Sequence, residues 1–157
     1  MRIKKCENMN TIIMLEVDAI DLKILKMLQE DGRRSFTEIA EKLKLSESTI
    51  RKRVQALQKK EVIKKFTIEV DPFKMGIRTV AIVGVDVDAT KLLEAAQKLC
   101  EIKEVRSVAT STGDHMIMTE IWTKDGRELT KLISEKIGKI EGVKKICPAI
   151  ILEKLKS

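Results

Sequence analysis

The sequence has few of the side chains that build metal and catalytic centres. It contains one histidine and three cysteines, Cys6, Cys100 and Cys147, which lie far apart. No pair of cysteines has the C-x-x-C spacing and the histidine has no cysteine neighbour, so no zinc site is expected. A nucleophile pattern, a metal-ligand cluster and a phosphate-binding loop are also missing, which argues against an enzyme and against a bound cofactor. The odd, widely spaced cysteines are expected to be small buried hydrophobes of a protein in the reducing cytoplasm.

Long apolar runs are missing as well. The apolar run Thr11–Leu15 is too short for the hydrophobic region of a secretory signal or for a bilayer crossing, so no membrane association is expected. Met9 and Met14 are alternative start positions, and residues 1–16 are interpreted as an N-terminal extension.

Charged side chains, in contrast, are abundant and unevenly placed. They make up 35% of the chain, a fraction typical of proteins from heat-loving organisms, and the net charge is +7. Residues 1–77 hold 17 Lys and Arg against 12 Asp and Glu, a difference of +5, which leaves +2 for the rest. Between positions 51 and 65 a single acid, Glu61, stands among the cations Arg51, Lys52, Arg53, Lys59, Lys60, Lys64 and Lys65. So local a cluster predicts a polyanionic partner, because concentrated cations release counterions from a phosphate backbone.

The basic cluster begins inside a predicted amphipathic helix over residues 46–58. Ser46 is a suitable N-cap, and Ile50, Val54 and Leu57 form one narrow apolar stripe. The opposite side carries Ser48, Lys52, Gln55 and Lys59, with Arg51 on its flank. Hydroxyls and amides read base edges and cations hold phosphates, so this face suits the major groove of DNA. Taken alone, such a face is usually only solvated surface; its context decides.

The context is a helix-turn-helix. One helix is expected from an N-cap at Asp18 to about Glu30, and Ser35 and Glu38 form a capping box at the start of a second. Lys44-Leu45 is the tight turn before the helix that Ser46 opens. The apolar residues Ile63, Phe66, Ile68 and Val70 then predict a strand or small hairpin that acts as a wing. Asp71-Pro72 and Met75-Gly76 follow as a linker.

The second half contains an internal repeat. Residues Ile102–Val108 resemble Ile140–Ile146, 38 positions later, and each copy follows a predicted helix and opens a strand. Together with strands over Thr79–Val87 and His115–Trp122, and helices over 89–99 (capped by Asp88) and 126–138, the order is β-α-β-β-α-β. This is a ferredoxin-like arrangement with four antiparallel strands and both helices on one face. Its other face is also apolar, and a second copy of the sheet is the simplest cover, which predicts a two-fold dimer.

The predicted fold class is therefore α+β, with an N-terminal winged helix-turn-helix and a C-terminal ferredoxin-like βαββαβ domain. The predicted bounds are 17–70 for the DNA-binding domain, 71–78 for the linker and 79–157 for the ligand-sensing and oligomerisation domain.

Taken together, several stretches of the chain resemble the leucine- and asparagine-responsive regulators, the Lrp/AsnC or feast/famine family. They are Val17–Leu25, Leu28–Arg33, Leu45–Val54, Gly76 and Thr112–Asp114. The resemblance implies a transcription regulator tuned by amino acids, a C-terminal domain of the RAM type, and dimers that assemble further into tetramers or octamers. The implied partners are double-stranded DNA and further copies of the chain, with the basal transcription machinery as a candidate.

The resemblance also implies an effector site at the loop formed here by Thr112, Gly113, Asp114, His115 and Met116. The family loop usually reads Gly-Asp-Tyr-Asp, and its second carboxylate meets the amino group of the ligand. Here His115 replaces the tyrosine and Met116 replaces that aspartate. A free α-amino acid is therefore expected to bind poorly, or the effector to be unusual, because a lost charge partner is costly. His115 itself is expected to be a turn or interface histidine.

On this interpretation the early turns of the helix from Ser46 approach base edges through Ser48, Thr49, Lys52 and Gln55. Phosphates are contacted by Arg51, Lys59, Lys60, Lys64 and Lys65. Arg53 has two candidate roles, a phosphate contact or a brace for the first helix. Two other classes of protein are weighed against this one: a βαββαβ enzyme or carrier with an appended helical domain, and a module that uses the helix-turn-helix to bind another polypeptide.

Overall fold

The computed structural model describes residues 17–155 of the protein. The predicted N-terminal extension, with Cys6 and the alternative start positions, lies outside the described residues. The chain divides into two compact units between Glu69 and Val70.

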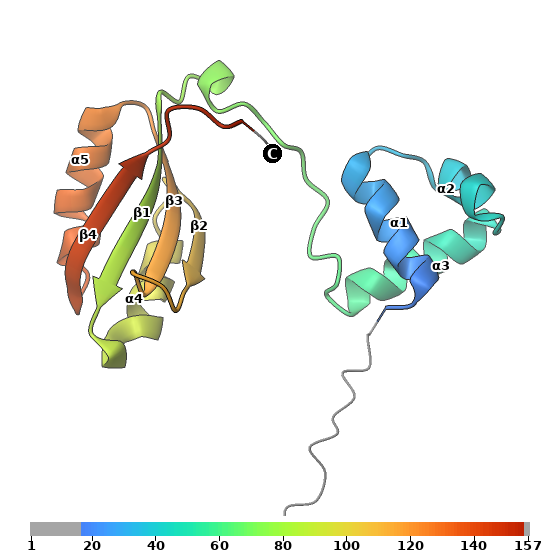
Figure 1. Cartoon of the computed structure of the whole chain (residues 1–157), viewed down its shortest axis with the longest axis horizontal. Helices are drawn as coiled ribbons and strands as arrows, with labels where there is room; N and C mark the ends of the chain where they lie inside the picture. Colours follow the sequence, from blue (N-terminus) through green and yellow to red (C-terminus); the bar gives the residue numbers. More distant parts are fainter. Residues whose placement is uncertain (1–16, 156–157) are drawn as a thin grey trace, which may run out of the picture. The chain divides into compact units, whose positions relative to one another are not determined.

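The first unit contains three helices, α1 (Ala19–Glu30), α2 (Phe36–Leu43) and α3 (Glu47–Lys59), seen in blue to green in Figure 1. The predicted helix starts are confirmed. The Asp18 carboxylate accepts hydrogen bonds from the N–H groups of Ile20 and Asp21, and Ser35 and Glu38 form a reciprocal capping box. Lys44, in the turn between α2 and α3, has φ 55°, a left-handed conformation that costs less for glycine.

The core of the helical unit is a small apolar cluster. Its buried members are Ile24 of α1, Ile39 and Ala40 of α2, and Ile50 and Val54 of α3. The exposed fractions of Ile50, Val54 and Leu57 are 0%, 2% and 1%, so the predicted apolar stripe of α3 is confirmed. The other side of α3 is thereby left facing outward.

The expected wing strand is not found. Residues 64–71 form neither helix nor strand. The side chains of Phe66 and Ile68 are 50% and 78% exposed, so they do not pack as those of a wing strand would. The alternation of apolar residues gives the period of a strand but supplies no partner, and a strand needs backbone hydrogen bonds from a neighbour. Ile63 instead packs against the helical core, and the N–H groups of Val62 and Ile63 donate to the carbonyl of Leu57.

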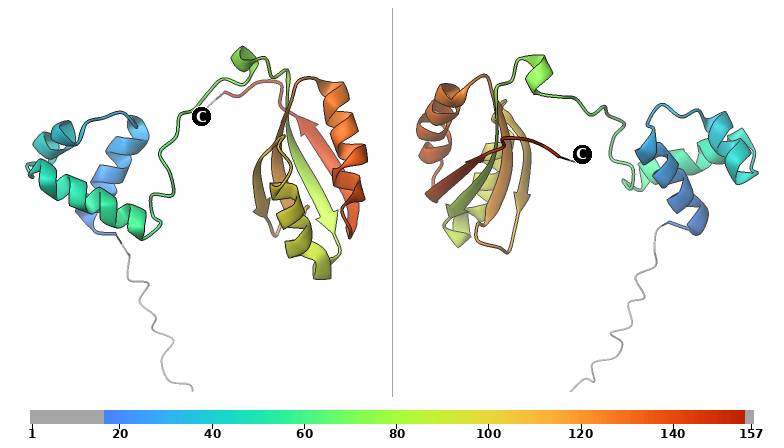
Figure 2. Two further views of the ribbon diagram at one scale, coloured as in Figure 1. Left: turned by 180° about the vertical axis from the view of Figure 1, so that it is seen from behind. Right: turned by 45° about the horizontal axis from the view of Figure 1, so that its top comes forward.

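The second unit is a four-stranded antiparallel sheet. Its strands are β1 (Thr79–Val87), β2 (Val105–Thr110), β3 (Ile117–Thr123) and β4 (Val143–Ile150), in the order β2-β3-β1-β4. Helices α4 (Leu92–Cys100) and α5 (Gly126–Glu135) lie on one face, as Figure 2 shows. Short 3₁₀ turns lie at Phe73–Met75, Ala89–Lys91 and Ile137–Lys139. The predicted α+β class and βαββαβ order are confirmed.

The two faces of this sheet differ. Alternate residues of β1, among them Ala81, Val83 and Val85, are buried against α4 and α5. The alternate set, Ile82, Gly84 and Asp86, belongs to the opposite face, which no helix of the described unit covers. By register this open face also carries Met118, Glu120, Trp122, Cys147 and Ala149. The indole N–H of Trp122 donates to Glu120 over 2.6 Å, and the Arg106 guanidinium lies 4.7 Å from the centroid of the Trp122 ring.

Two local predictions about this unit are wrong. Asp88 does not cap a helix, because a 3₁₀ turn follows it and α4 begins only at Leu92; its carboxylate instead pairs with Lys144 over 2.5 Å. Cys100 is exposed rather than buried, since it ends α4, and Cys147 is half-buried; both are free thiols. Over residues 17–155, no helix has the length and apolar character needed to cross a membrane.

Candidate nucleic-acid interface

The start of α3 is organised by three hydroxyl groups. Ser46 Oγ accepts a hydrogen bond from the N–H of Thr49 over 3.2 Å, as an N-cap should. The same oxygen lies 2.7 Å from Thr49 Oγ1 and 3.0 Å from Ser48 Oγ. The structure therefore brings together three of the residues that the sequence assigns to the interface. Ser48 is exposed, whereas Thr49 is half-buried.

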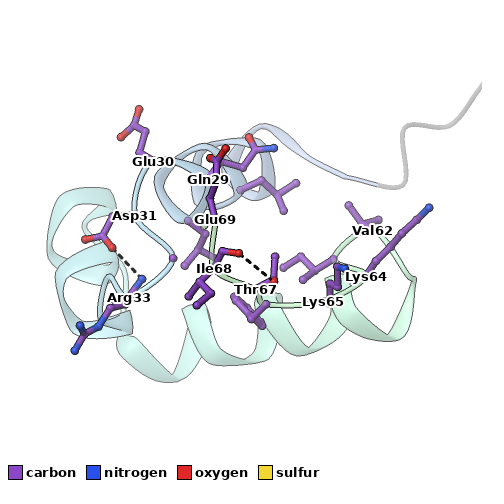
Figure 3. A pocket seen from close by; sticks show the side chains of 15 residues that line it. Gln29, Glu30, Asp31, Arg33, Val62, Lys64, Lys65, Thr67, Ile68 and Glu69 are labelled. Atoms are coloured by element: carbon purple, nitrogen blue, oxygen red, sulfur yellow. Dashed lines mark hydrogen bonds between the residues drawn. The ribbon is translucent and has the colours of Figure 1, made fainter. Parts of the chain in front are cut away.

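The outward face of α3 is cationic and largely uncompensated. Lys52, Gln55 and Lys59 are exposed, and neither lysine forms an ion pair with any residue that the structure describes. Lys60 is exposed at the end of α3. Lys64 and Lys65 follow on the segment that lines a groove beside the end of α1 (Figure 3). The ammonium groups of Lys52 and Lys59, which have no ion-pair partner among the described residues, are therefore available to phosphate groups.

Arg53 is joined to the start of α1 by two ion pairs. Its Nη1 lies 2.7 Å from Asp18 Oδ2 and 2.8 Å from Asp21 Oδ1, and its side chain is 28% exposed. These carboxylates raise the pKa of Arg53. Hydrogen bonds from the backbone of Asp21 and from Arg53 lower the pKa of Asp18. Arg53 therefore makes the contacts of one of its two predicted roles, that of a brace between α3 and the start of α1.

Arg51 also has partners inside the helical unit, and one of them is a residue that sequence reasoning did not single out. Its Nη2 donates to Glu47 Oε1 over 2.5 Å, and its guanidinium lies 5.4 Å from the centroid of the Phe36 ring. Thr37 of α2 donates to the other oxygen of Glu47 over 3.1 Å. Hydrogen bonds from Arg51 and Thr37 lower the pKa of Glu47. The spacing of Glu47 and Arg51, one helical turn apart, was the signal that could have revealed this pair.

The predicted effector loop divides into an exposed part and a part held by the sheet. Thr112, Gly113 and Asp114 are exposed, whereas Met116 is half-buried and packs against the core of the unit. His115 Nδ1 lies 3.2 Å from Asp86 Oδ2, and its ring covers Gly84 so closely that an added Cβ there would lie 2.1 Å from the ring. Met116 therefore packs against the core and does not belong to the exposed part of the loop.

Asp86 of β1 brings a second carboxylate to this loop, and sequence reasoning missed it. It accepts from the N–H of Met116 over 3.4 Å as well as contacting His115, and its side chain is 27% exposed. No sequence signal links Asp86 to His115, because they are 29 positions apart and the sheet alone brings them together. Within residues 17–155, no three His, Cys, Asp or Glu side chains are grouped so as to hold a metal ion.

A capped helix-turn-helix with an outward cationic helix, followed by a βαββαβ unit, defines a class of DNA-binding regulator. Comparison with protein families gives the same class. The AsnC-type helix-turn-helix domain matches residues 17–58, and the Lrp/AsnC ligand binding domain matches residues 80–157. The chain belongs to the Lrp/AsnC family of transcription regulators.

Relatives and solved structures agree with this assignment. The transcriptional regulator LrpA of Pyrococcus horikoshii is 54% identical over 140 residues, which are 89% of this chain and 99% of that one. LrpA1 of Halobacterium salinarum is 34% identical over 142 residues, 90% of this chain and 100% of its own. The structure of AsnC from E. coli matches with a TM-score of 0.79 at 24% identity, covering 90% of this chain and 95% of that one. A regulator of Neisseria meningitidis in complex with L-Met matches with the same TM-score at 23% identity, covering 90% and 93%. At these identities the two structures show the fold alone.

Proposed function

We propose that this regulator binds near-palindromic duplex sites as a two-fold dimer or a higher oligomer, with α3 of each copy in the major groove. The observation that carries the proposal is the outward face of α3, where exposed Lys52, Gln55 and Lys59 stand opposite a fully buried stripe. Two copies related by a two-fold axis read half-sites about one helical turn of DNA apart. We place this activity in the cytoplasm, where the free thiols Cys100 and Cys147 stay reduced.

The side chains divide into two groups by their chemistry. Hydroxyl, amide and ammonium groups on the early turns meet base edges: Ser48, Thr49, Lys52 and Gln55. The cations on the flank and beyond the helix meet phosphates: Arg51, Lys59, Lys60, Lys64 and Lys65. Ser46 acts as the cap that fixes the first turn, and Arg53 acts as the brace.

The two groups predict different effects of mutation. Gln55→Ala is expected to cost about 1–3 kcal/mol of binding on the preferred sequence and to relax selectivity at one base position. Lys64→Ala is expected to weaken all duplexes alike and to reduce the salt slope by about one. Gel-shift titrations over a salt series, with single-base operator variants, measure both. If Gln55→Ala binds every operator variant as the wild type does, α3 is wrongly placed in the groove.

For the dimer, we propose that the open face of the sheet is covered by the same face of a second copy. The alternation on β1, β3 and β4 leaves Ile82, Met118 and Trp122 beside Cys147 and Ala149 on this face. Apolar side chains on an uncovered sheet favour association. Light scattering at micromolar concentration should give at least a dimer, with tetramers and octamers as further expected species. A monomer would contradict the proposal.

We also propose modulation by an amino acid or a related small molecule at the loop 112–116. The support is the ligand-binding domain match and a structural neighbour whose complex contains L-Met. With Met116 packed inward and His115 beside Asp86, the loop lacks the second carboxylate on its exposed part. A thermal-shift screen with each amino acid tests this. If no amino acid raises the melting temperature, amino-acid sensing is contradicted.

A module that binds another polypeptide through the helix-turn-helix is the second candidate, and the family assignment does not favour it. Its binding would be insensitive to DNA sequence and nearly insensitive to salt, so the same salt titration separates the two. Contact with the basal transcription machinery is a further proposal, tested by pull-down of its components on promoter DNA.

A further inference from the structure

The first residue of α3 is an acid, on a surface proposed to meet phosphate groups. Glu47 has a side chain that is 44% exposed, and it precedes the exposed cations of the helix. A carboxylate in this place repels a phosphate backbone and lowers the general attraction of the surface for DNA. The role of Glu47 therefore has to be sought in DNA binding as well as in the fold.

Both oxygens of Glu47 have partners. Oε1 accepts from Arg51 Nη2 over 2.5 Å, and Oε2 accepts from Thr37 Oγ1 over 3.1 Å. The guanidinium of Arg51 lies over the ring of Phe36, in the first turn of α2. A flexible cation is thus held from two sides, by a carboxylate and by an aromatic face, while its side chain stays 55% exposed.

The stability of α3 alone does not require this arrangement. Exposed ion pairs one helical turn apart contribute little to folding, and Ser46 already caps the helix. The helix dipole favours an acid in the first turn, but any negatively charged side chain there would satisfy it. It does not require a side chain long enough to reach Arg51 and Thr37. Aspartate would satisfy the dipole and miss both contacts.

We propose that Glu47 is a specificity-determining residue of the DNA interface, which positions Arg51 before DNA arrives. The inference rests on the proposed function. An unrestrained arginine follows any nearby phosphate, whereas a restrained one can donate only to a phosphate at one register. Glu47 also repels phosphates that approach at other registers, which penalises binding to unrelated sequences. The pair therefore lowers non-specific affinity more than specific affinity.

The test compares two duplexes. One is selected by the wild-type chain from a random-sequence pool, and the other is a scrambled duplex of the same length and composition. Glu47→Gln should bind the scrambled duplex roughly threefold to tenfold more tightly without a gain on the selected one, so the ratio of the two affinities falls. Arg51→Lys should lower the same ratio while the salt slope stays unchanged, because the charge is kept and the planar fork is lost.

Two matched variants separate positioning from charge and from the dipole. Glu61→Gln removes the same charge just beyond the C-terminal end of α3. It should raise the affinity for both duplexes by the same factor. Glu47→Asp keeps the charge and the dipole but loses the reach, so it should lower the ratio by less than Glu47→Gln, because the repulsion of phosphates remains. Circular dichroism melting confirms that each variant is folded.

The outcomes distinguish this inference from the function on which it rests. A Glu47→Gln ratio equal to that of the wild type, or equal effects of Glu47→Gln and Glu61→Gln on it, would overturn the role of Glu47 alone. A wild-type chain that selects no duplex from the pool would overturn the proposed function and this inference together.

Discussion

The helical unit and the sheet unit differ in how they combine a core with a polar surface. The helical unit has a cluster of five buried residues, and the sheet unit has one of eleven. The helical unit compensates with local polar contacts, namely three capped helix starts and the brace from Arg53 to Asp18 and Asp21. In the sheet unit the pair of His115 with Asp86 lies at the open face, while other ion pairs, such as Lys131 with Glu135, lie on the helices. A unit with a small core can carry a charged surface such as the outward face of α3 when hydrogen bonds fix the ends of its helices.

The largest expected difference between the units concerns core truncation. Ile50→Ala removes a side chain that is 0% exposed and should cost about 2–5 kcal/mol. That is a large share of the stability of so small a unit, so the helical signal at 222 nm should melt at a much lower temperature. Ile121→Ala, equally buried in the larger core, is the matched control. If both variants lose the same amount in melting temperature, the two units do not differ in how well they tolerate the truncation of a core residue.

The next effect concerns the close contact between Gly84 and His115. Gly84→Ala places a Cβ within 2.1 Å of the ring, so the ring must move and leave Asp86, at a cost of about 1–3 kcal/mol. Urea unfolding should show this loss, and adding His115→Ala should recover part of it. Gly113→Ala in the exposed loop is the control and should be neutral. No recovery in the double variant would show that the strand, and not the ring, resists the added atom.

The smallest effect concerns acid stability of the helical unit. The pKa of Asp18 is lowered by hydrogen bonds from the backbone of Asp21 and from Arg53, so its ionised form is favoured in the folded state. Its contribution is present above the unfolded pKa, near 3.8, and is lost as the pH falls through the lower folded value. Melting temperatures between pH 6 and pH 2 should therefore fall less steeply below about pH 4 for Asp18→Asn than for wild type. Equal slopes would contradict the role of Asp18.

The parts predictable from sequence are those set by neighbours along the chain. Asp18, Ser35 and Ser46 cap helices through N–H groups two or three residues away, so a short motif suffices. The buried stripe of α3 follows from helical periodicity in the same way. The repeat at Ile102 and Ile140 gave the βαββαβ order because each copy has its own local pattern.

The parts that were missed depend on distant partners. Arg53 reaches Asp18 and Asp21 across 35 and 32 positions, so sequence left it with two roles. The wing strand was expected from alternation at Phe66 and Ile68, which indicates a period but not a pairing partner. His115 reaches Asp86 only because β1 and β3 are neighbours. The Glu47–Arg51 pair was within reach of local reasoning, yet its contacts to Phe36 and Thr37 needed the packing of α2 on α3.

The single tryptophan of the chain, Trp122, is an intrinsic probe at a useful place. Its indole belongs to the bare side of the sheet, beside Glu120 and Arg106, and the helical unit has no tryptophan among its described residues. If copies pair through this face as proposed, its emission should move to shorter wavelength on association and stay nearly constant when DNA is added to an already assembled sample. One unlabelled dilution series would then yield the self-association constant separately from the affinity for DNA.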